Sequence, residues 1–132
     1  MASGRRDYTW GFLNESATEG RYTESFSKYF YIGIPALDNV LAYTYTVPAG
    51  YKLGVNRIIL TSTSGVPNLV YIKKAATVLI GGFLNGNMTF DFSDSNPMYF
   101  SAGEVLNIQI YSNEYYTCGI YGYVIGALEQ LT

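Results

Sequence analysis

Val47-Pro48-Ala49-Gly50-Tyr51-Lys52-Leu53-Gly54-Val55 returns later in the chain as Phe100-Ser101-Ala102-Gly103-Glu104-Val105-Leu106-Asn107-Ile108. Both stretches follow the pattern apolar-x-Ala-Gly-x-x-Leu-x-(Val/Ile). Pro48 suits the second position of a type I turn, and Gly50 suits the fourth. Two such corners, at Pro48 and Gly50 and again at Gly103, predict two Greek-key halves folded over one core. The alternative is a chance match, because Ala-Gly is a common turn dipeptide.

The rest of the chain alternates apolar and polar residues with a period of two rather than 3.6. Asn85-Gly86 predicts a two-residue hairpin, and Gly81-Gly82 predicts a bend in the sheet. The predicted strands cover residues 29–34, 41–47, 53–63, 69–73, 77–80, 88–92, 106–111 and 117–126. We therefore expect an all-β fold, a single eight-stranded antiparallel jelly-roll sandwich or barrel with an extended N-terminal arm.

The start of the chain differs from the remainder. Residues 1–39 are predicted to form the extended N-terminal arm and the first edge strand, and residues 40–132 the jelly-roll domain. Trp10-Gly11-Phe12-Leu13 is too apolar for a solvated tail, which favours docking over the alternative of a disordered tail. The residues predicted to anchor the docked arm are Arg5, Arg6, Tyr8, Trp10, Phe12, Leu13, Tyr22 and Phe26.

Charge is sparse and uneven in this chain of 132 residues. Charged residues make up 14% of it, against about 25% in typical soluble domains. Half of them lie in residues 1–39, so the surface of the remaining domain must consist largely of Tyr, Thr, Ser, Asn and apolar atoms. Protein interfaces are enriched in Tyr and depleted in Lys and Glu. We expect the domain to pack against other chains; the alternative is a neutral surface that is simply soluble.

The composition argues against several classes of function. The chain has no histidine, so the commonest general base and metal ligand are missing, and we expect no enzyme and no cofactor. Cys118, the single cysteine, is interpreted as a buried thiol. The oxygen-rich run 91–96 could bind Ca²⁺, but a polar turn is favoured, and no metal is expected.

Nucleic acid and membrane partners are also not expected. The net charge of −2 disfavours direct binding of nucleic acid. No window approaches the roughly 18 apolar residues of a transmembrane helix, and residues 1–6 precede no apolar stretch typical of a secretory signal. We therefore expect synthesis in a cytoplasm without export by the usual route.

The fourteen tyrosines supply the candidate binding residues. Tyr combines a flat apolar ring with a polar tip, so it suits subunit interfaces and sugar-binding platforms alike. The candidates for an interface or a ligand-binding face are Tyr115, Tyr116, Tyr121 and Tyr123. Cross-strand packing or a subunit interface is favoured over sugar binding.

Residues 40–126 resemble small jelly-roll virion proteins of tailed phages and related viruses. The resemblance lies in the Tyr- and Thr-rich strand before Val47-Pro48-Ala49-Gly50, in Phe100-Ser101-Ala102-Gly103-Glu104, and in the closing Gly119-Ile120-Tyr121-Gly122-Tyr123. It implies a structural component of the virion, such as a capsid decoration or cement protein, a head fibre or a minor tail protein. It also implies a homotrimer that contacts the major capsid protein or other virion proteins. The alternatives are a carbohydrate-binding host-attachment module and a minor tail or baseplate component.

Overall fold

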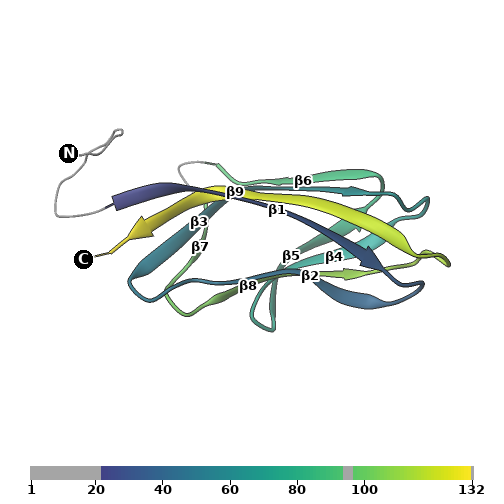
Figure 1. Ribbon diagram of the computed structural model, residues 1–132, viewed down its shortest axis with the longest axis horizontal. Coiled ribbons are helices and arrows are strands. Elements are labelled where there is room, and N and C mark those ends of the chain that lie inside the picture. Colours follow the sequence, from purple (N-terminus) through teal and green to yellow (C-terminus); the bar gives the residue numbers. More distant parts are fainter. Residues whose placement is uncertain (1–21, 94–96, 132) are drawn as a thin grey trace.

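The computed structural model describes residues 22–93 and 97–131, and the regular elements in these ranges are all β-strands (Figure 1). They form two antiparallel sheets, of order β1-β9-β3-β6 with β7 also pairing with β3, and of order β2-β8-β4-β5. The all-β prediction is confirmed. The strands are β1 (Tyr22–Ile34), β2 (Asn39–Thr46), β3 (Tyr51–Ser62), β4 (Asn68–Lys74), β5 (Thr77–Leu84), β6 (Asn87–Asp91), β7 (Met98–Phe100), β8 (Val105–Tyr111) and β9 (Cys118–Gln130).

The chain folds as one long hairpin wound around the core. β4 pairs with β5 across a short turn, β3 pairs with β6 and β7, β2 pairs with β8, and β1 pairs with β9. This nested pairing is that of a jelly roll. β6 and β7 pair with successive parts of β3, at Arg57–Thr61 and at Leu53–Val55. They therefore act as one interrupted strand, which explains why nine strands are described where eight were expected.

The repeated sequence forms the same turn twice. The Tyr51 N–H donates to the Pro48 carbonyl at 3.2 Å, and Ser101–Glu104 closes in the same way at 2.9 Å. Gly50 has a φ of +84° and Gly103 a φ of +83°. Pro48 thus occupies the first position and Gly50 the third, one position earlier than predicted. A positive φ at the third position is the type II geometry, which favours glycine.

The two turns lie side by side where the wound hairpin passes from one sheet to the other. The Val47 N–H donates to the Glu104 carbonyl at 3.0 Å, and the Gly103 N–H donates to the Val47 carbonyl at 2.8 Å. The connections β1–β2 and β8–β9, where the hairpin next changes sheet, are joined in a similar way. There the Leu37 N–H donates to the Glu114 carbonyl at 3.0 Å. The corner occurs twice in the sequence because both limbs of the hairpin turn at the same place.

Three local expectations need correction. β1 begins at Tyr22, seven residues before the predicted strand, and pairs with β9 along its whole length. Asn85-Gly86 does not close a hairpin, because it joins β5 to β6, which belong to different sheets. The strand predicted to end at Ile80 continues through Gly81-Gly82 to Leu84, and the space beside these glycines is filled by the Tyr71 ring and the Met88 side chain.

The core lies between the two sheets and is built from the inward positions of both. Leu53, Ile58, Ile108 and Ile120 are fully buried. Burial of each such side chain contributes about 1.5–3 kcal/mol to folding.

The described ranges contain no helix long and apolar enough to cross a membrane.

We predict that Gly50→Ala and Gly103→Ala each lower the free energy of unfolding by about 1–2 kcal/mol, because a Cβ disfavours positive φ. A Cβ would meet nothing within 4 Å at either position, so the cost is conformational. Urea unfolding measures the effect, and Gly33→Ala, which also has open space but no positive φ, is the matched control. An equal response of all three variants would contradict the proposed origin of the repeat.

Candidate functional site

Four tyrosines form two cross-strand pairs on the outer surface of the sheet that contains β1 and β9. Tyr29 lies opposite Tyr123 and Tyr31 opposite Tyr121. Their ring centroids are 5.1 Å and 4.7 Å apart, respectively. Each side chain remains between 41% and 55% exposed. We call these four residues the tyrosine face; it presents aromatic rings to solvent because the alternate positions of both strands face the core.

The surroundings of the tyrosine face are uncharged or charge-compensated. On β3, Ile59 lies beside Tyr123 and Thr61 lies beside Tyr121. The Thr61 hydroxyl donates a hydrogen bond to Asn87 Oδ1 at 3.0 Å. Arg57 and Asp91 follow along the same surface and form an ion pair at 3.3 Å. The central part of this sheet surface therefore carries no uncompensated charge.

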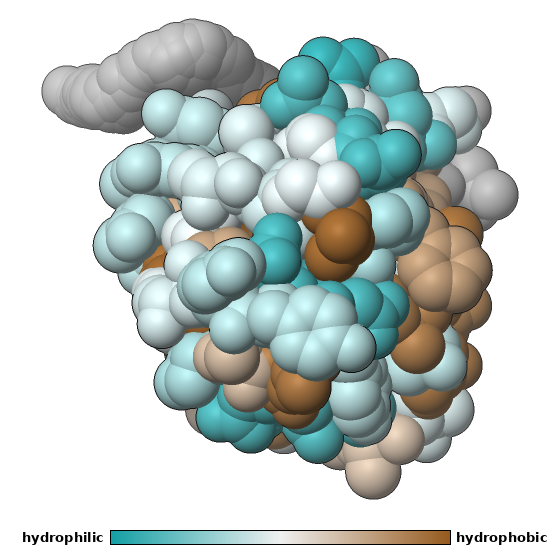
Figure 2. Space-filling view, turned by 90° about the vertical axis from the view of Figure 1, so that its right-hand side faces the viewer, coloured by the Kyte–Doolittle hydropathy of each residue, from teal (hydrophilic) through white to brown (hydrophobic). Residues whose placement is uncertain are grey.

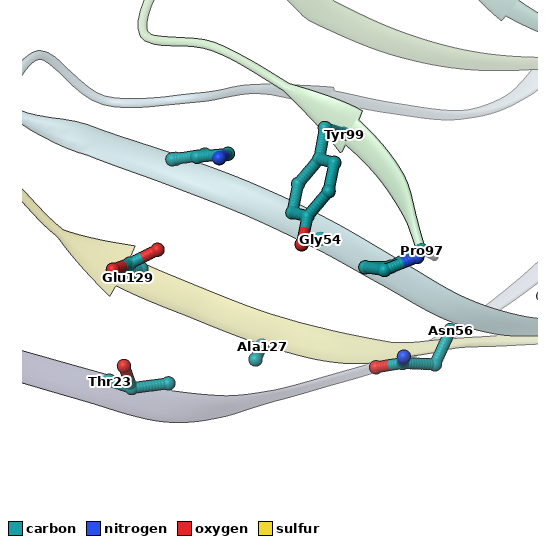
Figure 3. Close-up of a pocket in the computed structure, with 8 residues that line it drawn as sticks. Thr23, Gly54, Asn56, Pro97, Tyr99, Ala127 and Glu129 are labelled. Atoms are coloured by element: carbon teal, nitrogen blue, oxygen red, sulfur yellow. The ribbon is translucent and has the colours of Figure 1, made fainter. Parts of the chain in front are cut away.

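A shallow pocket of about 300 Å³ lies further along the same sheet. Figure 3 shows Tyr99 standing over Gly54 beside Pro97. The Lys52 ammonium lies 4.1 Å from the centroid of the Tyr99 ring, in a cation–π contact. An aromatic wall with hydroxyl, amide and carboxylate groups around it can hold a small polar ligand such as a sugar ring. The lining residues are Thr23, Lys52, Gly54, Asn56, Pro97, Tyr99, Ala127 and Glu129.

Tyr115 and Tyr116 lie on a different surface, in the loop between β8 and β9. They are 75% and 77% exposed. Leu37 is tied to this loop through Glu114 and is itself 58% exposed, with a φ of +56°. A leucine in the left-handed region is rare, because its Cβ crowds the backbone. This end of the sandwich thus presents three large apolar side chains, one of them on a strained residue.

The Glu114 carboxylate holds this loop against the neighbouring one. It accepts hydrogen bonds from the Gly65 N–H at 3.1 Å, from the Tyr115 N–H at 3.0 Å and from the Ser64 hydroxyl at 3.2 Å. The Gly65 N–H is the main cause that holds the pKa of Glu114 below its ordinary value, and the other two donors add to it. The exposed tyrosines are therefore presented by an organised loop.

A second apolar surface follows β5, which is the edge strand beside β4. Val78, Leu79, Ile80 and Phe83 are between 37% and 63% exposed. Thr77–Leu84 contains no charged residue. In Figure 2, apolar side chains gather along the right-hand border of the end that faces the viewer. An uncharged, exposed edge strand is an available template for pairing with another strand.

The structure separates the candidates that the sequence grouped together. Tyr121 and Tyr123 lie on the tyrosine face, whereas Tyr115 and Tyr116 lie on the loop. Tyr29 and Tyr31 were not singled out, although their alternation with a buried Phe30 is visible in the sequence.

The predicted arm residues fall into two groups. Phe26 is 3% exposed and packs in the core of its own sandwich, so it is not an anchor for a neighbouring subunit, and Tyr22 begins β1. The division of the chain at residue 39 stays a prediction, but β1 is a full strand of the sandwich. The other predicted anchors lie outside the described residues: Arg5, Arg6, Tyr8, Trp10, Phe12 and Leu13.

Cys118 is 3% exposed, and its Sγ lies 3.9 Å from the Ser112 hydroxyl oxygen. Within residues 22–93 and 97–131, no group of three His, Cys, Asp or Glu side chains is placed to hold a metal ion.

We predict that Leu37→Asn raises the free energy of unfolding by about 0.5–1 kcal/mol, because asparagine tolerates the left-handed region better than leucine. Thermal unfolding followed by circular dichroism measures the change. Leu41→Asn is the matched control, since Leu41 is 51% exposed and lies in β2 without a positive φ. A gain of similar size in the control would show that reduced hydrophobicity, and not backbone strain, is responsible.

We predict that Glu114→Gln lowers stability at pH 7 and that its effect fades in acid. Folding lowers the pKa of this carboxyl below its ordinary value of 4.5. The stabilisation is therefore fully present above pH 4.5 and is lost as the pH falls through the lower folded-state pKa. Urea unfolding of both proteins across this range measures the difference, and a difference that is independent of pH would contradict the role of the ionised carboxylate.

Comparison with known proteins finds a similar fold but identifies no family. No protein-family model and no curated protein matches the chain. A solved structure of Bacillus endospore appendages, which form disulfide-linked pili, is similar at a TM-score of 0.54 and 9% identity, covering 92% of this chain and 100% of that one.

Two further solved structures are similar at lower TM-scores. The Drosophila NLP core has a TM-score of 0.35 and 16% identity, covering 80% of this chain and 98% of its own. A virus-like particle of the Macrobrachium rosenbergii extra small virus has a TM-score of 0.41 and 7% identity, covering 97% and 92%. At such identities, the likeness to the endospore appendage protein shows a shared fold alone.

Proposed function

We propose that this protein is a structural protein of a virion, a capsid decoration or cement subunit that stabilises the shell through inter-subunit contacts. The observation that carries the proposal is the tyrosine face, a neutral surface with two exposed aromatic pairs. In this role the subunits form a homotrimer, as the resemblance to small virion jelly rolls implies, and the trimer contacts the major capsid protein.

The chemistry of the tyrosine face suits a protein partner. Tyr rings bury a large apolar area at low entropic cost and keep a hydroxyl for hydrogen bonding. Arg57 and Asp91, on the same surface of the sheet, already neutralise one another. A partner that covers the face therefore does not have to desolvate an unpaired charge on this surface. Such a desolvation would oppose association.

Association in this role is non-covalent. The endospore appendage protein that shares this fold forms disulfide-linked pili. The present chain has one cysteine, Cys118, and its side chain is buried. A disulfide between subunits would require the core to open, so packing and hydrogen bonding are left to hold the assembly together.

The pocket supports a second candidate function, a carbohydrate-binding host-attachment module. The Tyr99 ring and the amide of Asn56 are the features that a sugar would use. A glycan array separates the two functions: binding that is lost in Tyr99→Ala favours attachment. A minor tail or baseplate component uses the same kind of contacts as a decoration protein, and a cryo-EM map of the native particle separates those two positions.

We predict that Tyr31→Glu and Tyr123→Glu each raise the dissociation constant of the oligomer by about tenfold or more, because a charge would be buried at the contact. Sedimentation velocity of the purified chain over a range of concentrations measures it. Thr44→Glu, an exposed position on β2 in the other sheet, is the matched control. A wild-type chain that stays monomeric at every concentration would contradict the proposal.

A further inference from the structure

The free side of β5 is less protected than the other sheet edges of the described residues. β1 carries Glu24 and Lys28, and β6 carries Asp91. β2 has no charge, but Thr44 and Thr46 are exposed along it, and β7 is only three residues long. Charged or polar residues and short length are the usual means by which proteins prevent edge strands from pairing.

β5 has neither of these protections. After Thr77, all its side chains are apolar or absent, and Phe83 is 63% exposed. A bulge at Leu79 interrupts the pairing with β4, but Ile80–Leu84 continues as a regular stretch beyond it. A strand laid against this side would gain backbone hydrogen bonds and cover apolar side chains at the same time.

The chain itself contains a segment that matches this edge. Residues 8–13, with the sequence Tyr-Thr-Trp-Gly-Phe-Leu, place aromatic side chains at every second position, which is the pattern of a strand. They carry no charge, as β5 carries none. We infer that residues 8–13 of one copy add to the free edge of β5 of another copy as an extra strand.

The residues between this segment and β1 favour a link between copies. Residues 14–21 include Glu15, Glu19, Gly20 and Arg21, and they contain no large apolar residue. Fully extended, they and the adjoining bonds span about 30 Å. A polar spacer of this kind suits a solvated bridge between two molecules better than a segment lying across the end of its own sandwich.

Such a contact is heterologous, because the arm of one copy meets β5 of the next. Heterologous contacts close into rings when the rotation between copies allows it. The inference therefore rests on the proposed function and deepens it, by naming the element that would tie one subunit of the trimer to the next.

Trp10 provides the probe, because it is the only tryptophan in the chain and lies within the proposed segment. In the wild-type full-length protein, we expect emission typical of a buried indole at concentrations where the protein is assembled, and a shift to longer wavelength on dilution. Phe83→Lys and Val78→Lys should shift emission to longer wavelength and raise the dissociation constant by about tenfold. Leu41→Lys, on the opposite edge of the same sheet and 51% exposed, should behave as the wild type.

Deleting residues 1–20 should reproduce the loss of assembly while leaving the β-sheet circular dichroism unchanged, because β1 begins at Tyr22. A buried Trp10 whose emission does not change on dilution would place the segment on its own chain and overturn the inference. So would wild-type emission and assembly in both lysine variants. If those variants assemble normally while Tyr31→Glu does not, the inference fails and the proposed function stands.

Discussion

The structure depends on the backbone pairing between the two limbs of one wound hairpin, and most of all on the bonds that join Val47 to Gly103 and Glu104. These bonds hold the limbs in register where they leave one sheet for the other. A slip of one residue would turn side chains such as Ile108 and Ile120 from the core to the solvent. The positive φ of the corner glycines is thus a requirement of the whole sandwich.

This arrangement buries an apolar core between the sheets and leaves the tyrosine face and the β5 edge exposed. The tyrosine face offers aromatic rings without net charge, and β5 offers apolar side chains beside a free strand edge. Only 14% of the residues are charged, so the protein has few surface charges to keep it soluble while these two surfaces are exposed. Low charge and these two surfaces have a common explanation if the protein functions in an assembly.

The sequence alone predicted the strands well, since side-chain alternation reports directly which face of a strand is buried. It missed the first part of β1, because the outer positions there are polar and Phe26 stands isolated among them. Asn85-Gly86 was misread, because the same turn residues serve hairpins and connections between sheets. The tyrosine face was half predicted: Tyr29 and Tyr123 are distant in the sequence, and only the pairing of β1 with β9 brings them together.

The nested pairing also sets the order in which the protein can fold during synthesis. The Ala75-Ala76 turn joins strands that are neighbours in the sequence, so β4 and β5 can pair as soon as both have left the ribosome. Tyr22, in contrast, lies opposite Gln130, so β1 must wait for β9 before it can pair. β1 therefore stays unpaired until β9 has been made, and the sandwich can close only then.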